Sequence, residues 1–470
     1  MKATGLFLLL PALVSAAPLS ISAPPDVALT TPHRIEVLAE GLKVPWELRF
    51  LPDGRQIFTE RIGRVRIVEQ GKLLDEPALT LPVAQGNKMG LLGLVLAPDF
   101  EKTGHLFLAW DKAVGDRRFE LRMERYRLDG NKLVEPKTII EGIAANQNHT
   151  GCRLEFGPDG MLYMTTGDAD QADGVQKLDQ LHGKILRFNA DGSVPQDNPF
   201  VSKEGARPEI WSYGHRNPQG LAFQPGTGRL YESEHGPLHG DEVNLIEKGA
   251  NYGWPVISHR REGEGMRTPL IEITPAVGPG RLLFYQGKAF PELRGTLLLC
   301  CLRGSAVFRI SLGGDGLPTH IERLWNKKWG RIRFINEAPD GSLWLGTSMQ
   351  DPPEGKPNEG DDKLIRIVPD PNGSVEAVAG KTAEPVLLTP DMDDPEKIIA
   401  AACAACHGPG LAGGEKRGLL SGEFKHLKDP ADLEKTIRDG VPAAGMPPAS
   451  GLLSEKQIQL VADYIRAKRR

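Results

Sequence analysis

Short runs of Val, Ile, Leu and Phe alternate with turn signals along residues 33–370. Pro fixes φ at the first turn position and Asp-Gly supplies the bend. The signals are Leu51-Pro-Asp-Gly54, Ala97-Pro-Asp-Phe100, Phe156-Gly-Pro-Asp-Gly160, Gln224-Pro-Gly226 and Ala338-Pro-Asp-Gly341. A unit of roughly 50 residues built of short strands is typical of propeller blades. We therefore predict an all-β six-bladed β-propeller. A β-sandwich is the alternative, but sandwiches rarely run this long without splitting.

The pattern changes after residue 370. Residues 371–390 carry Pro, Gly, Ala and Thr without periodicity, which predicts a linker. Asp394-Pro395-Glu396 then indicates a helix start. A last helix is indicated by a Ser454 N-cap with Gln457 three residues on, and by apolar residues at helical spacing. These are Leu453, Ile458, Val461, Tyr464 and Ile465. Residues 391–470 are expected to form a small all-α domain.

The first 17 residues read as a secretory signal. Lys2 is followed by an apolar run from Leu6 to Val14 and then by Ser15-Ala16-Ala17. A buried N-terminal helix is the alternative. The run is too short to span a bilayer, and no later segment is long and apolar enough to do so. The sequence thus predicts an exported protein, periplasmic or secreted, that is not an integral membrane protein.

Charge and cysteine content narrow the function further. The 470 residues hold 57 basic and 61 acidic side chains, a balance that does not favour nucleic acid as a partner. Five cysteines are too few for a disulfide scaffold.

Cys403-Ala-Ala-Cys406-His407 is the C-x-x-C-H pattern of c-type haem attachment. Both thiols would form thioethers to the haem, and His407 would supply the proximal nitrogen. A redox or zinc C-x-x-C is the alternative, and the histidine that follows directly argues against it. Met446 is the expected sixth ligand and His426 its rival. His/Met ligation suits electron transfer, and this tail resembles class I cytochrome c domains.

A haem in the same chain calls for an electron donor in the propeller. No G-x-G-x-x-G follows a strand there, so a nicotinamide or flavin fold is not indicated. Four polar clusters instead occur in order: Asn146-Gln-Asn-His149-Thr-Gly-Cys-Arg153, Thr165-Thr-Gly-Asp168, Tyr213-Gly-His-Arg216-Asn217-Pro-Gln-Gly220 and Glu234-His-Gly-Pro237. With these clusters, residues from about 35 to 368 resemble the soluble PQQ-dependent sugar dehydrogenases, which include the glucose, aldose-sugar and sorbosone enzymes.

The resemblance implies roles for the catalytic residues. His149 matches the family's base, which takes the proton of the anomeric hydroxyl while hydride passes to PQQ. Asp168 matches the carboxylate that orients this base. Arg216 matches a cation that stabilises negative charge on the quinone, and Asn217 would contact the same edge. The plainer alternatives are a structural His, a turn Asp and an Arg that binds loop carbonyls.

The resemblance also implies the cofactor contacts. Gly236 and Pro237 match the positions whose carbonyls bind the active-site Ca²⁺. Asp241, Glu242 and Tyr252 lie in a region that carries structural calcium in the family. The PQQ carboxylates call for cations, and the matching residues are Lys88, Arg303, Arg331 and Arg333. Strand alternation would place Arg331 and Arg333 on one side. Lys88 departs from a common family Gln, and the segment after Ile273 lacks the aromatic residues of the glucose pocket.

Three cysteines remain outside the haem motif. We hypothesise that Cys152 pairs with Cys300 or Cys301 in an oxidising compartment.

The sequence thus predicts an exported quinohaemoprotein that oxidises aldoses at C1 to lactones with PQQ, Ca²⁺ and haem c. Sorbosone or other aldehydes are alternative substrates, and the electrons would pass to an external cytochrome, copper protein or quinone/oxidase chain. Two other classes stay open: a calcium-dependent propeller hydrolase carrying a cytochrome, and a non-enzymatic propeller that presents one.

Overall fold

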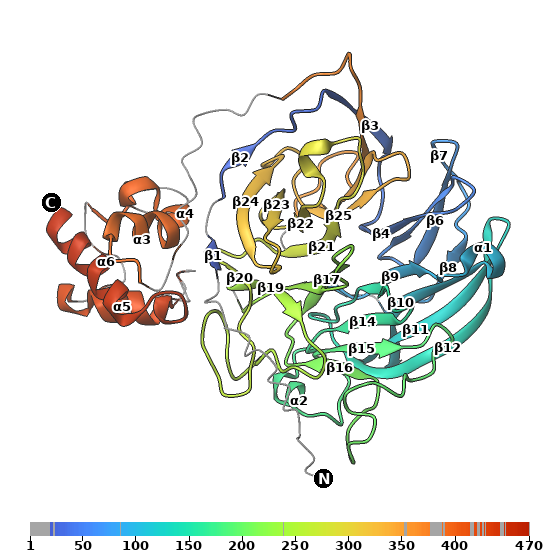
Figure 1. Ribbon diagram of the computed structural model, residues 1–470, viewed down its shortest axis with the longest axis horizontal. Helices are drawn as coiled ribbons and strands as arrows, with labels where there is room; N and C mark the ends of the chain where they lie inside the picture. The colour runs from blue at the N-terminus through green and yellow to red at the C-terminus, as the bar shows by residue number, and fades with distance from the viewer. Residues whose placement is uncertain are drawn as a thin grey trace, which may run out of the picture.

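The computed structural model describes residues 19–21, 24–84, 86–237, 239–351, 355–376, 388, 391–413, 418–420, 424, 427, 429–441, 446 and 448–469. The predicted signal, residues 1–17, lies outside them, as does most of the predicted linker. The structure consists of a strand-rich ring and a small helical unit (Figure 1). The predicted fold class is confirmed.

Six antiparallel sheets form the ring, and four consecutive strands build each of the first three. These strands are β4 (Pro45–Phe50), β5 (Gln56–Glu60), β6 (Arg64–Glu69) and β7 (Lys72–Leu73), with β8 (Leu79–Thr80) paired to β6; β9 (Leu91–Leu96), β10 (His105–Gly115), β11 (Arg118–Asp129) and β12 (Lys132–Ala145); and β13 (Leu154–Phe156), β14 (Leu162–Thr166), β15 (Lys184–Phe188) and β16 (Ile210–Tyr213).

The next two sheets each gain a short parallel strand from the N-terminal segment, and the last is completed by β3 (His33–Ala39). Their strands are β17 (Pro218–Phe223), β18 (Leu230–Glu234), β19 (Asp241–Ile246), β20 (Ile271–Ile273) and β1 (Leu19–Ile21); β21 (Pro279–Phe284), β22 (Leu297–Cys301), β23 (Ala306–Leu312), β24 (Pro318–Leu324) and β2 (Asp26–Val27); and β25 (Ile332–Glu337), β26 (Leu343–Thr347) and β27 (Leu364–Pro369). The propeller thus begins before residue 33, where the sequence analysis placed its start.

The five predicted turns, three of them Pro-Asp-Gly, connect the first and second strands of five blades. Gly54, Gly160 and Gly341 adopt the left-handed conformation that this turn requires, with φ of 89°, 74° and 80°. No such turn signal occurs between Gly226 and Ala338, and the blade of β21 and β22 lies in this interval. There the connection is longer and contains a 3₁₀ turn, η1 (Pro291–Leu293), instead.

Hydrophobic cores lie between neighbouring blades all the way round. Leu106 and Val65 share one core, Leu186 and Phe107 a second, and Tyr163 and Leu221 a third. Three further cores join the remaining blades and close the ring between the last and the first. Each blade therefore buries both faces, which is what holds the ring together.

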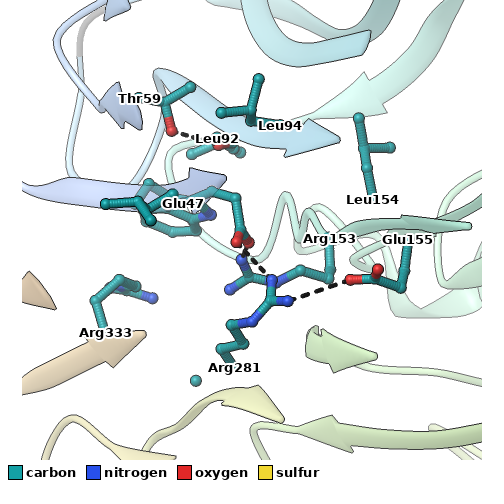
Figure 2. A network of polar contacts seen from close by, with 12 residues as sticks. Glu47, Thr59, Leu92, Leu94, Arg153, Leu154, Glu155, Arg281 and Arg333 are labelled. Carbon is teal, nitrogen blue, oxygen red and sulfur yellow. Dashed lines mark hydrogen bonds and ion pairs between the residues drawn. The ribbon is translucent and has the colours of Figure 1, made fainter. Parts of the chain in front are cut away.

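A buried ionic network joins blades that are not neighbours (Figure 2). Glu47 on β4 pairs with Arg153, next to β13, and with Arg281 on β21. Arg281 also reaches Glu155 on β13, with Nη2 3.4 Å from Oε2. Strands of non-neighbouring blades can meet only across the centre of the ring, so these side chains fill its axis. Removing one partner would leave a buried charge uncompensated, which makes the network a strong constraint on the register of the inner strands.

The C-terminal unit is helical. Its elements are α3 (Pro395–Ala402), α4 (Ala404–His407), η2 (Pro409–Leu411), η3 (Pro430–Asp432), α5 (Leu433–Asp439), η5 (Ala449–Gly451) and α6 (Glu455–Lys468). The predicted caps are present: Asp394 accepts from two backbone N–H groups of α3, and Ser454 and Gln457 form a capping box on α6. The propeller has two further short helices, α1 (Phe100–Thr103) and α2 (Ala172–Val175). No helix among the described residues is long and apolar enough to cross a membrane.

Candidate functional site

The antiparallel order of the strands collects the predicted site residues at one rim of the propeller. Connections between blades and connections between second and third strands all lie at the same end of the ring. Six of the predicted residues or pairs come from such connections: Lys88, His149, Asp168, Arg216 with Asn217, Gly236 with Pro237, and Arg303. The Pro-Asp-Gly turns lie at the opposite end.

His149 and Asp168 form a hydrogen-bonded pair, as predicted. His149 Nδ1 lies 2.9 Å from Asp168 Oδ1 and 3.2 Å from Asp170 Oδ1. A Cβ atom on Gly167 would lie 1.9 Å from the His149 carbonyl oxygen, so only glycine allows this approach of the two loops. Because Nδ1 is engaged, Nε2 is the nitrogen that remains for a substrate proton.

Asp168 is held ionised by its surroundings. It is 2 % exposed, and burial alone would raise its pKa. Hydrogen bonds from His149, from the Asp170 backbone and from Trp254 Nε1, at 2.8 Å, outweigh burial and leave the pKa of Asp168 below its usual range. The carboxylate is therefore suited to hold an imidazolium.

Arg216 lies beside this pair. Its Nη1 donates to the carbonyl oxygens of His235, at 3.0 Å, and Gly236, at 2.7 Å, and its guanidinium packs over Trp254. Burial lowers the pKa of Arg216, although nearby carboxylates act to raise it. The Nε of Arg216 is buried without a hydrogen-bond partner. The loop-carbonyl alternative is therefore present in the structure, and the Nε of the same side chain is left as a donor for a ligand.

Asn217 is turned inward. Its Oδ1 accepts from Gln219 Nε2 at 3.0 Å and from the Gly151 backbone N–H at 3.3 Å. The amide therefore supports the loop that follows His149, in addition to any contact with a ligand.

The predicted calcium residues separate into two groups. Gly236, Pro237, Glu242 and Tyr252 line one hollow together with Arg216 and Glu234. Asp241 lies behind it: Oδ1 accepts from the Gly236 N–H, and Oδ2 from the N–H groups of Val277 and Gly278. Burial raises the pKa of Asp241 to about 6, although these three hydrogen bonds act to lower it. Asp241 shapes the Gly236 loop through the backbone.

Three of the predicted cations lie close enough to His235 for their charges to affect its pKa. After burial, the charges of Lys88, Arg333 and Arg216 are what lower the pKa of His235 well below its usual range. Arg303 is exposed, and its charge contributes to lowering the pKa of His239, mainly a burial effect, to about 4. A concentration of positive charge of this kind suits a ligand that carries several carboxylates.

Arg331 lies directly before β25 (Ile332–Glu337), and Arg333 is the second residue of that strand. Both converge on Asp351, which also lies 3.9 Å from Arg61 Nη1. Arg333 further donates to Gln219 and packs over Trp46, with its guanidinium carbon 3.9 Å from the ring centroid. Its Nε and the Nε of Arg216 are buried donors without a partner, so the residues present fit an anionic quinone cofactor.

Sequence reasoning missed three residues here: Asp170, Trp254 and Asp351. Asp170 stands two residues past Asp168, and Trp254 belongs to the Asn251-Tyr-Gly-Trp-Pro255 motif, so both carried a local signal. Asp351 carried none, because it reaches the arginines only through the fold.

The hypothesis of a disulfide between Cys152 and Cys300 or Cys301 is wrong. All three are free and buried, and they lie in three different cores between blades. Cys300 and Cys301 alternate on β22 and so face opposite sides of the sheet. Burial raises the pKa of Cys300 to about 12, which makes it an inert core residue.

The haem motif begins at the residue directly after α3 and ends with the last residue of α4. Cys403 follows α3, and Cys406 and His407 end α4. Cys403 and Met446 pack against the same hydrophobic core, built by residues such as Ile398 and Ile458. The rival ligand His426 lies outside the described residues. The thiol and thioether on one apolar core fit a covalently bound haem.

Comparisons with known proteins agree with this arrangement. Residues 42–354 match the family model of glucose/sorbosone dehydrogenase, and residues 390–465 match that of cytochrome c oxidase, cbb3-type, subunit III. The aldose sugar dehydrogenase of Escherichia coli (strain K12) is 35% identical over 67% of this chain and 89% of its own length.

Solved structures show the same relationship. A putative oxidoreductase (glucose dehydrogenase) from Thermus thermophilus is 40% identical, with a TM-score of 0.66 over 72% of this chain and 100% of that one. The PQQ-bound form of aldose sugar dehydrogenase from Streptomyces coelicolor is 31% identical, with a TM-score of 0.63 over 75% and 100%. The predicted resemblance is confirmed: this chain belongs to the glucose/sorbosone dehydrogenase family and carries a cytochrome c domain in the same polypeptide.

Proposed function

We propose that this protein is an exported PQQ- and calcium-dependent dehydrogenase that oxidises aldoses at C1 to lactones and passes the electrons to its own haem c. The observation that carries the proposal is the His149–Asp168 pair beside Arg216, at the rim where Lys88 and Arg333 gather positive charge. The PQQ-bound relative supports the identity of the cofactor.

His149 is the proposed base. Its Nε2 takes the proton of the sugar C1 hydroxyl, while Asp168 and Asp170 hold Nδ1–H and stabilise the resulting imidazolium. PQQ, when bound, supplies the two-electron acceptor for the hydride from C1.

Arg216, and a Ca²⁺ ion when one is bound by the Gly236 and Pro237 carbonyls, are proposed to polarise the cofactor. Arg216 places a fixed cation where negative charge develops, and Trp254 keeps that cation in position. The carbonyl oxygens of Gly236 and Pro237 are suited to a hard Ca²⁺ ion. Lys88, Arg303, Arg331 and Arg333 are proposed to bind the cofactor carboxylates.

The helical unit is proposed to receive electrons one at a time. Cys403 and Cys406 would hold the haem, with His407 and Met446 as axial ligands, and an external cytochrome, copper protein or quinone/oxidase chain would take the electrons onward. The haem and the signal-like residues 1–17 together favour export to the periplasm or beyond.

One assay separates the proposal from the hydrolase and non-enzymatic alternatives. The purified full chain is reconstituted with PQQ and Ca²⁺, sugars are added, and the haem spectrum is followed. We expect reduction of the haem with aldoses and none without PQQ. A protein that leaves its haem oxidised with every aldose, sorbosone and other aldehyde, or that hydrolyses lactones instead, is not this dehydrogenase.

Replacement of Trp254 by phenylalanine tests the proposed role of Asp168. The phenyl ring keeps an aromatic face under Arg216 but removes the N–H donor to Asp168 Oδ2. The pKa of Asp168 should rise, so its protonation, and with it the acid-side fall of kcat/KM, should begin at a higher pH than in the wild type. Trp344→Phe, in another blade and without a bonded N–H, is the matched control. Identical acid limbs for all three proteins would contradict the role.

A further inference from the structure

Strands β18 and β19 present a compact group of polar side chains on one face. Glu232 and Glu234 alternate along β18, and Glu242 and Asn244 alternate along β19, so each pair points to one side. In the antiparallel register Glu232 lies opposite Asn244, and Glu234 lies opposite Glu242. Three carboxylates and one amide therefore meet inside a single blade.

Three members of this group are buried without a compensating cation, and Glu242 is half-buried. Glu232 is 0 %, Asn244 1 % and Glu234 3 % exposed. Within the part of the chain that the structure describes, no Lys or Arg side chain forms an ion pair with Glu232, Glu234 or Glu242. Burying ionised carboxylates without a partner is costly, so something must offset the charge.

Hydrogen bonds inside the group do not suffice. Asn244 Nδ2 has two hydrogens but faces three carboxylate oxygens, at 3.0 Å from Glu232, 3.2 Å from Glu234 and 3.2 Å from Glu242. Two acceptors at the centre, Glu232 Oε1 and Asn244 Oδ1, are buried without any hydrogen-bond partner. Such unsatisfied oxygens are rare and point to a missing ligand.

A histidine completes the set of donor atoms. His215 is 0 % exposed, and its Nδ1 lies 3.3 Å from Glu234 Oε1. Its Nε2 lies 2.9 Å from Ser212 Oγ, which can fix the tautomer that leaves Nδ1 as an electron-pair donor. One ligand atom each from His215, Glu232 and Glu234 lies within 4.8 Å of the others.

We infer that His215, Glu232, Glu234 and the amide oxygen of Asn244 bind a divalent cation inside this blade. A turn of the Asn244 amide by 180° would exchange its crowded N–H donors for its unpartnered oxygen. The set of carboxylate and amide oxygens with one imidazole nitrogen suits Ca²⁺ or Mn²⁺.

This ion is not the proposed quinone calcium. Its site is connected to the active-site loop through Glu234. Glu234 Oε2 accepts the backbone N–H groups of Arg216, at 2.6 Å, and Asn217, at 3.3 Å. An ion on the other carboxylate oxygen would fix Glu234 and, through it, the loop that carries Arg216. His215 and Glu232 do not line the hollow of Gly236 and Pro237, whereas Glu234 does, so Glu234 lies between the two proposed ion sites.

Metal counting on the full-length, haem-loaded protein tests the inference without PQQ or sugar, so its outcome is independent of the proposed function. The protein is stripped with EDTA, dialysed against Mn²⁺ or Ca²⁺ alone, and analysed for bound metal and thermal unfolding. We expect wild type to bind one ion per chain more than Glu232→Gln, whose amide oxygen still accepts from Asn244. The midpoint temperature of the wild type, but not of the variant, should rise on addition of the ion.

Two variants make the result decisive. Glu272→Gln changes a buried carboxylate on β20 that bonds His259 instead, and it should keep the ion. Asn244→Asp adds a fourth carboxylate: it should destabilise the ion-free protein but tighten binding of the ion. Equal ion counts in wild type and Glu232→Gln, or an ion-free wild type that unfolds at the temperature of the loaded one, would overturn the inference.

Discussion

Replacement of His149 by alanine should lower kcat for aldose oxidation by about 10²- to 10⁴-fold, the usual contribution of a positioned general base. The variant removes the imidazole that Asp168 and Asp170 orient, and it leaves Arg216 and the other cations of the rim in place. PQQ should therefore still bind. Stopped-flow measurement of haem reduction gives the rate, and PQQ titration gives the affinity.

The exposed His320 provides a control, since its side chain is 50 % exposed and it lies within β24, the fourth antiparallel strand of its blade. His320→Ala should oxidise aldoses at the wild-type rate. If His149→Ala retained wild-type kcat, or lost PQQ altogether, His149 would not be the base.

Double replacement of Cys403 and Cys406 by alanine should abolish the covalent haem and with it all transfer to an external one-electron acceptor. The propeller is not altered by this change, because the two cysteines belong to the helical unit with its own hydrophobic core. Oxidation of aldose measured with an artificial dye should continue. Haem absorbance after denaturation, compared with the dye-coupled rate, separates the two activities.

Cys152→Ala removes a thiol from a propeller core and serves as the matched control for loss of a cysteine. It should retain the haem. Persistence of covalent haem in the double variant, or loss of the dye-coupled activity together with the haem, would contradict the division of labour between the two units.

Local signals predicted the propeller well because five of the six blades repeat a similar proline-containing turn. Pro-Asp-Gly segments such as the one at Gly160 have few conformations to choose from, and the structure shows them where expected. The blade of β21 and β22 lacks the turn. Its presence was indicated only by the distance between the turns at Gln224 and Ala338, which is about twice the usual one. Strands β1 and β2 went unpredicted because two or three residues carry no periodicity.

Site residues could be predicted where they stand in short sequence motifs, and not where only the fold brings them together. His149, Asp168 and Arg216 stand in recognisable clusters, and the structure brings them together. Asp241 looked like a metal ligand beside Glu242, but neighbours on a strand face opposite sides. Its carboxylate meets backbone N–H groups from residues 277 and 278, a contact that no local pattern encodes.

Closure of the ring by β3 and β27 has a consequence for how the chain folds. Ile35 pairs with Ile367, so the last blade cannot form until nearly the whole repeat has been made. Contacts between such distant segments slow folding, and until they form, the last blade leaves a strand edge open to pairing with another chain. The helical unit follows β27 in the chain, so the ring can seal before that unit exists. Slow, aggregation-prone refolding of the isolated propeller is the expected result, independent of haem.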